Sequence, residues 1–306
     1  MKNKKIVIII LLLIFLTGCT KTLKDDDNKT VKNPVTGQSL TENILCRPEI
    51  EETVEVYKKN NVKIESLPKC SNFSIDSGGY EGLWTSGFVK PLAFTILLIA
   101  RYVGSAGLAL ILTSILLRTI LYPVTKKTVM QAETMKKAQP ELAKLETKYK
   151  DKKDQDSMMK KSQEMTAIYK KHNINPIAGC LFALIQLPLF IAFLEAINRV
   201  PALFEESFLW LQLGTTPSVG LMTNGEWFYI VLIILVGAST YFAFNMNKPI
   251  STKPNDPMKN MTSIMTVMII VMGFFMPTAL CLYWITSNLF TIVQNLIIRR
   301  SREAVW

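Results

Sequence analysis

The chain has 306 residues, of which 49% are hydrophobic, and a formal net charge of +11 at neutral pH. Its basic residues lie mostly between long apolar runs, which indicates a polytopic membrane protein rather than a soluble nucleic-acid-binding domain. His172 is the one histidine, and no cysteines stand at metal-ligand spacing, so we predict no metal site and no cofactor.

Residues 1–18 are predicted to be a lipoprotein signal peptide. Three lysines precede an apolar run of eleven residues, Ile6–Leu16, which is shorter than the roughly 20 residues that a spanning helix needs. The run ends in Leu16-Thr17-Gly18-Cys19, which resembles the lipobox of bacterial lipoproteins. The resemblance implies cleavage before Cys19 and attachment of a diacylglyceryl lipid, such as one carrying palmitate, to its thiol. The alternative is an uncleaved signal anchor that ends in an accidental cysteine.

Residues 19–80 are predicted to be an extracytoplasmic, lipid-anchored linker. The segment is polar and mixed in charge, with Asp25-Asp26-Asp27 and Lys58-Lys59, and such a composition buries little apolar surface. It contains Cys46 and Cys70. An oxidising exterior would allow a disulfide between them, and two unpaired thiols fit the sequence equally well.

Five apolar segments are predicted to cross the membrane, after an interfacial amphipathic helix at 81–104 whose apolar run, Pro91–Ala100, is too short to span. The predicted spans are residues 105–125, 177–199, 227–247, 261–277 and 278–298. The remaining segments are a lysine-rich stretch at 126–176, an extracytoplasmic loop at 200–226, a cytoplasmic loop at 248–260 and a cytoplasmic tail at 299–306.

The last apolar region, Met261–Ile298, is predicted to form two spans rather than one. As a single helix its 38 residues would extend ~57 Å, almost twice the hydrocarbon thickness. Pro277 lies near the middle, where a helix would lose a hydrogen bond, so we place a turn at Met276-Pro277. With five spans all the strongly basic segments lie on one side, which predicts a lipidated N-terminus outside a bacterial cell and a C-terminus in the cytoplasm.

The segment 126–176 is predicted to be a cytoplasmic antiparallel hairpin of two helices. Apolar residues recur at three-to-four spacing over 135–149 and 158–169, and the charged stretch 151–156 has turn chemistry. Pro140 predicts a kink or a fresh helix start. Residues 126–175 hold 13 lysines against 7 acidic residues. These charges form a solvated face, or else contact anionic lipid headgroups or ribosomal RNA.

Arg118 is the one basic residue well inside a predicted span. Burying an unpaired guanidinium there costs at least ~2.5–3.5 kcal/mol, so the side chain either snorkels to the interface or occupies a polar pocket. Candidate companions are polar residues of three predicted spans: Thr113, Ser114, Gln186, Trp284, Ser287, Asn288, Thr291, Gln294 and Asn295. Several polar side chains together with an arginine predict a hydrophilic cavity that opens toward the lysine-rich side.

Four stretches of the chain resemble the YidC/Oxa/Alb insertases. They are LILTSILLRTILYPV at 110–124, MKKAQPELAKLETKY at 135–149, HNINPIAGCLFALIQLPLFIAFLE at 172–195 and MPTALCLYWITSNLFTIVQ at 276–294. The resemblance covers residues 80–300 in order, and the lipobox without a large exported domain resembles the Gram-positive form of the family.

The resemblance implies an all-α fold of five transmembrane helices around a groove that is open to the cytoplasm and lined by Arg118, with Gln186 and Trp284 nearby. Thr113, Ser114 and Asn288 complete the expected client-contacting set. It implies a chaperone and insertase for nascent membrane proteins, with no chemical reaction, acting alone or with the Sec translocon. The lysine-rich hairpin and Arg299, Arg300 and Arg302 are the candidate contacts with the ribosome.

Two other classes of function compete with this one. A small-anion transporter or channel is the alternative, because a buried arginine could bind a carboxylate or a phosphate. The sequence shows neither inverted repeats nor paired broken helices, which favours the insertase. An intramembrane enzyme is disfavoured because the predicted spans offer no His, Asp or Lys at membrane depth.

Overall fold

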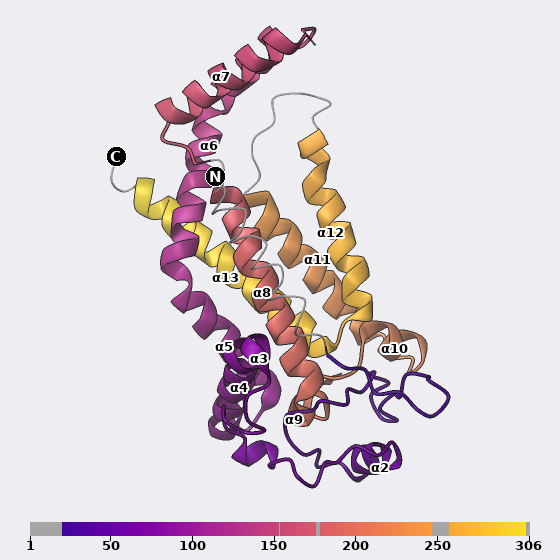
Figure 1. Cartoon of the computed structure of the whole chain (residues 1–306). Coiled ribbons are helices and arrows are strands. Elements are labelled where there is room, and N and C mark those ends of the chain that lie inside the picture. Colours follow the sequence, from indigo (N-terminus) through magenta and orange to yellow (C-terminus); the bar gives the residue numbers. More distant parts are fainter. Residues whose placement is uncertain (1–19, 153, 176–177, 247–256, 304–306) are drawn as a thin grey trace. The chain divides into compact units, whose positions relative to one another are not determined.

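The structure is a computed structural model that describes residues 20–152, 154–175, 178–246 and 257–303 (Figure 1). These residues are mostly helical, and their one sheet is a two-stranded antiparallel hairpin. The predicted signal peptide, Cys19 and most of the predicted loop 248–260 lie outside the described residues. The all-α expectation is confirmed.

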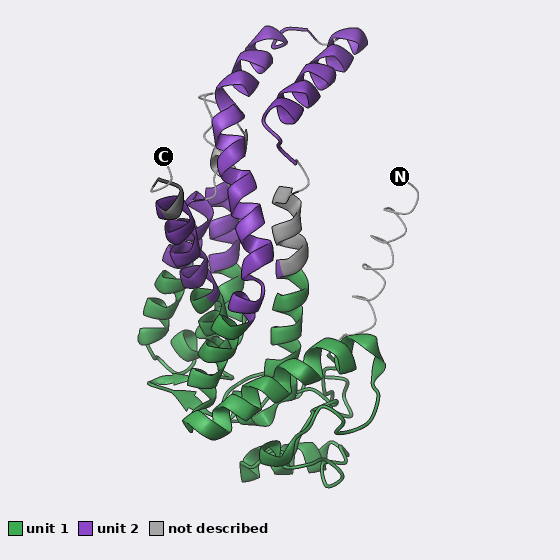
Figure 2. Ribbon diagram, turned by 90° about the vertical axis from the view of Figure 1, so that its left-hand side faces the viewer, with its two compact units in different colours: residues 1–116, 187–236, 271–286 green, residues 117–186, 237–270, 287–306 purple. Residues whose placement is uncertain are grey.

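The chain forms two compact units, which Figure 2 colours separately. Unit 1 comprises residues 1–116, 187–236 and 271–286, and unit 2 comprises residues 117–186, 237–270 and 287–306. Five helices contribute residues to both units: α5 (Ala106–Ile120), α8 (Ala178–Arg199), α11 (Phe228–Met246), α12 (Pro257–Phe275) and α13 (Thr278–Glu303). Unit 2 also holds α6 (Tyr122–Lys148) and α7 (Gln155–Lys171).

The other elements of unit 1 are short, apart from α4. They are α2 (Glu51–Lys59), a 3-10 turn (Cys70–Asn72), α3 (Gly82–Trp84), a π turn (Thr85–Val89), α4 (Lys90–Val103), α9 (Pro201–Phe204), β1 (Ser207–Phe208), β2 (Leu211–Gln212) and α10 (Pro217–Met222).

Three helical runs in the described part of the chain are long and apolar enough to cross a membrane: Gly82–Val103, Phe228–Met246 and Thr278–Arg300. The bent pair α5 and α6 gives a fourth if it counts as one span. The run Gly82–Val103 lies within residues 81–104, for which the sequence predicted an interfacial helix; at 22 residues it is longer than the apolar stretch Pro91–Ala100 that was judged too short to span. The count of five spans stays a prediction.

Prolines mark the ends of two predicted spans. Helix α5 ends at Ile120, short of residue 125 where the predicted span ends, and α6 continues after a bend of 67°. Pro123 lies in the first turn of α6, where its missing N–H is tolerated but could not have continued α5. Likewise α12 ends at Phe275 and α13 begins at Thr278, so the chain turns at Met276-Pro277.

Helix α6 runs through Pro140 without a break, although the sequence predicted a kink or a new helix start there. Ala138 and Leu145 are buried on either side of the proline, and their packing offsets the lost hydrogen bond. Helix α7 lies antiparallel to α6, since Lys171 pairs with Glu141 at 2.8 Å and Lys148 pairs with Glu164 at 2.6 Å.

The segment after Cys19 is folded from residue 20 onward, so its prediction as a linker was wrong. Leu23, Leu40, Ile44, Tyr57 and Ile64 form a buried cluster with Phe204 from the distant 200–226 loop. The sequence did not predict this core because its apolar residues are few and follow neither a helical nor a strand period. They come together only in the folded structure.

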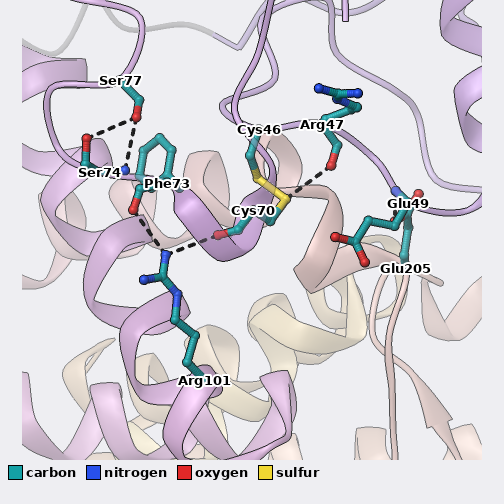
Figure 3. Close-up of a disulfide and its surroundings, with 9 residues drawn as sticks. All are labelled: Cys46, Arg47, Glu49, Cys70, Phe73, Ser74, Ser77, Arg101 and Glu205. Carbon is teal, nitrogen blue, oxygen red and sulfur yellow. Dashed lines mark hydrogen bonds between the residues drawn. A yellow bond between two sulfur atoms is a disulfide. The ribbon is translucent and has the colours of Figure 1, made fainter. Parts of the chain in front are cut away.

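Cys46 and Cys70 form a disulfide, with their Sγ atoms 2.11 Å apart (Figure 3). Arg101, near the end of α4, donates hydrogen bonds to the backbone oxygens of Cys70 at 3.4 Å and Phe73 at 3.2 Å. The disulfide therefore closes the loop between residues 46 and 70, and Arg101 holds the end of that loop against α4.

Two fully buried cations converge on one carboxylate in unit 1. Lys90 Nζ lies 2.8 Å from Glu81 Oε1 and donates to the carbonyl oxygens of Ser77 and Gly79 at 2.8 Å and 2.6 Å. Arg199, at the end of α8, contacts Glu81 Oε2 through Nη2 at 2.6 Å. Burial would raise the pKa of Glu81, but hydrogen bonds from Lys90 and Arg199 outweigh it and hold the pKa below its ordinary value.

Arg199 also ties the N-terminal segment to α8. Its Nε donates to the carbonyl oxygen of Asn43 at 2.6 Å, and its own carbonyl oxygen accepts from the Leu45 N–H at 2.7 Å. Nη1 lies 3.9 Å from Glu195 Oε2, an ion-pair contact, while Glu195 Oε1 accepts from the Trp84 indole at 2.9 Å. One arginine thus joins α8, Glu81 and the segment around residue 44.

We predict that Arg199→Ala destabilises the protein by about 3–5 kcal/mol, because Glu195 loses its buried cation and Glu81 loses one of its two. Thermal unfolding in detergent measures this. The control is Lys58→Ala, which removes an exposed ion pair with Glu65 and should change stability by about 1 kcal/mol or less. A similar loss in both variants would contradict the prediction.

The lowered pKa of Glu81 also predicts a pH dependence. A carboxylate with a depressed folded-state pKa contributes stability above its ordinary pKa, and that contribution disappears as pH falls through the depressed value. Glu81→Gln should therefore narrow the stability difference between neutral and acidic pH. An unchanged pH profile of the unfolding temperature would contradict this assignment.

Candidate functional site

Arg118 lies in the last turn of α5 and is 5% exposed within the protein. Its Nε donates a hydrogen bond to Ser287 Oγ at 2.6 Å, and its Nη2 donates to Gln186 Oε1 at 2.6 Å and also to Ser287. All three residues belong to unit 2. The guanidinium is therefore held between α5, α8 and α13.

The chemistry of these acceptors determines what the site can do. Ser287 and Gln186 offer a neutral hydroxyl and a neutral amide oxygen, so their hydrogen bonds orient the guanidinium without cancelling its charge. Two contacts from different atoms of the planar fork fix its direction. The arrangement is a positioned positive charge among apolar helices, and it suits transient attraction of an anionic group.

Helix α13 continues the polar site as a stripe within unit 2. Asn288 donates to Ser239 at 3.3 Å and to Thr240 at 3.0 Å, both on α11. One to two turns further, Gln294 donates to Thr125 of α6 at 2.7 Å. Because residues four and seven apart share a helix face, Ser287, Thr291 and Gln294 lie along one side of α13, next to Asn288.

Asn295 is fully buried next to this stripe. Neither its amide nitrogen nor its amide oxygen has a hydrogen-bond partner among the described residues. A buried amide left without partners costs ~1–3 kcal/mol, which a bound water molecule removes. The position therefore favours a hydrated interior along this part of α13.

The other expected site residues lie in unit 1. Thr113 is fully buried, and its hydroxyl has no partner among the described residues. Ser114 donates to the carbonyl oxygen of Leu110 at 2.7 Å. Trp284 packs edge-on against Phe190, with ring centroids 5.3 Å apart.

The sequence named Gln186 and Ser287 alike as candidate companions of Arg118, and the structure shows that both accept hydrogen bonds from its guanidinium. The position of Ser287 on the stripe with Asn288 and Thr291 was the available signal. The sequence did not predict Ser239 and Thr240 as the partners of Asn288. Two small hydroxyl residues in an apolar helix commonly hydrogen-bond to the backbone of their own helix, so they do not indicate a site.

Arg299, a candidate ribosome contact, is engaged within unit 2. It pairs with Glu133 at 2.8 Å and donates to the carbonyl oxygen of Met246, the last described residue of α11. Lys136 donates to the same carbonyl oxygen at 2.8 Å and pairs with Glu133 at 3.0 Å. Two cations thus face the C-terminal end of α11, which the helix dipole favours. Arg300 is exposed, and the side chain of Arg302 lies outside the described residues.

A positioned intramembrane cation with a polar helix stripe defines the class: a polytopic helical membrane protein with a hydrophilic interior site. Residues 98–304 match a family model described as 60Kd inner membrane protein. The membrane protein insertase YidC of Oceanobacillus iheyensis is 34% identical over 225 residues, which cover 73% of this chain and 86% of that protein. The insertase MisCA of Bacillus subtilis is 37% identical over 217 residues, covering 71% and 79%. The chain belongs to the YidC/Oxa/Alb family of membrane protein insertases.

A solved structure agrees with this fold. It is described as an active YidC insertase with its first transmembrane domain resolved, and it superimposes with a TM-score of 0.52 at 23% sequence identity. The match covers 79% of this chain and 52% of that chain, so the present chain spans about half of that protein's length.

We predict that Ser287→Ala destabilises the protein by about 1–3 kcal/mol, because it removes an acceptor from a buried guanidinium. The matched control is Thr286→Ala on the same helix, whose hydroxyl donates only to the Leu282 carbonyl oxygen of its own helix at 2.8 Å. Unfolding in detergent compares the two. Equal losses would mean that the hydrogen bond to Arg118 contributes nothing.

Proposed function

We propose that this protein inserts and folds nascent membrane proteins, and that Arg118 is the residue that draws a client's acidic segment into the bilayer. The insertase function follows from the family, whose members are named for it rather than for a chemical reaction. The observation that carries the role of Arg118 is its position, buried in unit 2 and oriented by Ser287 and Gln186.

The physical problem for an insertase is desolvation. Moving a polar segment of a client into hydrocarbon costs several kcal/mol for each group that loses its hydrogen bonds. A polar stripe supplies hydrogen bonds partway, and a fixed positive charge attracts Asp and Glu residues of the segment. Asn288, Gln294 and Asn295 support this reading for unit 2. Thr113, Ser114 and Trp284 remain predicted groove residues, as the family resemblance implies.

We also propose two partners besides nascent clients, the ribosome and the Sec translocon. We propose that the ribosome contacts exposed lysines of α6 and α7 together with Arg300, since Arg299 is engaged with Glu133 and Met246. Cooperation with the Sec translocon follows from the family resemblance alone. Depleting the protein and surveying which membrane proteins then fail to insert would identify the clients and their dependence on the translocon. Normal insertion of every membrane protein after depletion would contradict the insertase function.

We predict that Arg118→Ala impairs insertion of clients with acidic exported segments. Arg118→Lys should retain much of the activity, because electrostatic attraction requires a positive charge more than it requires the planar, bidentate geometry of a guanidinium. Client insertion and the level of folded protein are measured in parallel. The control is Ser287→Ala, which loses one hydrogen-bond acceptor but keeps the charge. If Arg118→Ala is stable and inserts acidic-tailed clients normally, the proposed role of Arg118 is wrong.

We also propose that the N-terminus is lipidated at Cys19 and lies outside the cytoplasm. Leu16-Thr17-Gly18-Cys19 supports the lipid anchor. Cys19→Ala is expected to accumulate as an unprocessed precursor without lipid, which mass spectrometry detects. A wild-type protein that still begins at Met1 would overturn the proposal.

The proposed orientation, with a five-span core, rests on the distribution of lysine and arginine. A cysteine at Asn224 should react with an impermeant maleimide added to intact cells, whereas cysteines at Lys152 and Ser301 should react only after the cells are opened. Labelling of Ser301→Cys from outside would mean that the last apolar region crosses the membrane once.

A further inference from the structure

The loop at 200–226 ends in an exposed apolar tip. Strand β1 pairs with β2 so that Ser207 faces Gln212 and Phe208 faces Leu211. Leu209 and Trp210 form the turn, and they are 69% and 61% exposed. A turn between two strands at a protein surface normally carries Gly, Asn or Asp, so this pair of large apolar residues needs an explanation.

The backbone conformation at residue 209 makes a leucine there more unusual still. Leu209 has φ +56°, in the left-handed region. The other non-glycine residues with positive φ in the described part of the chain are Asn28, Asn61 and Asn173, and asparagine tolerates this conformation because its side chain can hydrogen-bond locally. A leucine at such a position gains nothing from the fold itself, because most of its side chain contacts no protein.

The hairpin is fixed at the ends of helices that cross the membrane. The Gln212 N–H donates to the Tyr229 hydroxyl, in the first turn of α11, at 3.2 Å. The first N–H groups of α13 donate to the same loop, from Ala279 to the Leu213 carbonyl oxygen at 2.9 Å and from Thr278 to that of Thr215 at 2.9 Å. Because α11 and α13 are both long enough to span, the hairpin lies at the level of one membrane surface.

A third helix is bound to the same loop. The N–H of Ala106, the first residue of α5, donates to Glu206 Oε1 at 2.8 Å. Phe208 packs so closely on Gly107 that a Cβ there would meet its ring carbon at 2.3 Å. These contacts leave the hairpin no freedom to fold its tip back against the protein.

The tip carries no charge of its own. The loop has no lysine or arginine between Val200 and Glu226. Glu205 accepts from the Glu49 N–H at 3.2 Å, and Glu206 is used at the start of α5. Trp227, immediately before α11, is also 69% exposed. Aromatic residues at the ends of spans are typical of the membrane–water interface.

We propose that Leu209 and Trp210 insert into the headgroup–acyl boundary of the lipid bilayer and so anchor this loop beside the ends of α5, α11 and α13. Lipid is the favoured occupant because the tip is uncharged, lies at the level of the span ends and includes a tryptophan, whose ring suits that boundary. The inference is independent of the role of Arg118 and of which side of the membrane the loop occupies.

Tryptophan fluorescence in vesicles of phosphatidylcholine and phosphatidylglycerol tests the proposal. The difference between the wild-type emission and that of Trp210→Phe isolates Trp210. Acyl chains brominated near the headgroup should quench this difference signal several-fold more strongly than chains brominated deep in the bilayer, and aqueous iodide should quench it weakly. Strong quenching by iodide with none by brominated lipid would overturn the proposal.

Two variants sharpen the result. Glu52→Trp in the Trp210→Phe protein places an indole on the exposed, charged face of α2, where iodide should quench it and brominated lipid should not. Leu209→Asn relieves the left-handed backbone but removes the apolar side chain, so it should preserve folding and reduce lipid quenching of Trp210. Protection of Trp210 from both quenchers would show that protein covers the tip, a second copy or another partner, and would also overturn the proposal.

Discussion

A guanidinium buried among apolar helices is the constraint on which unit 2 depends. Such a charge is tolerated only if its N–H groups find acceptors, and Arg118 finds them on two other helices, at Gln186 of α8 and Ser287 of α13. Both acceptors are neutral, so the helices are held together while the positive charge is kept. The same contacts hold the helices together and, in the function proposed above, orient the charge that attracts an acidic segment of a client.

In unit 1 the buried cations lie against carboxylates. Lys90 and Arg199 are fully buried as well, but both lie against the carboxylate of Glu81, and Arg199 also faces Glu195. There the charges are compensated, and their hydrogen bonds tie the N-terminal segment to α4 and α8. The two sites thus differ in their acceptors: carboxylates accept from Lys90 and Arg199, whereas a hydroxyl and an amide oxygen accept from Arg118.

The sequence predicted the helical class, the family, the turn at Pro277 and the polar neighbours of Arg118, because each rests on a strong local signal: long apolar runs, a proline in the middle of one, and a single charge inside another. The comparisons confirm the family and the insertase function. The fold of residues 20–80 could not be predicted, since its core forms only when Leu23, Leu40 and Tyr57 meet Phe204. Ser287 was named among several candidate companions of Arg118 but could not be singled out, because nothing in a helical stripe tells which hydroxyl faces a given arginine.

In the proposed function, residue 118 and the exported charge of a client act on each other during insertion. A double-mutant cycle measures this directly, with Arg118→Ala in the insertase and acidic-to-neutral changes in the client's exported segment. We expect a coupling energy of roughly 0.5–3 kcal/mol between the change at residue 118 and the neutralisation of the client. Arg118→Ala should then impair insertion of the acidic client and leave insertion of the neutralised client nearly unaffected. Equal impairment of both clients, with no coupling, would contradict the proposed role of residue 118.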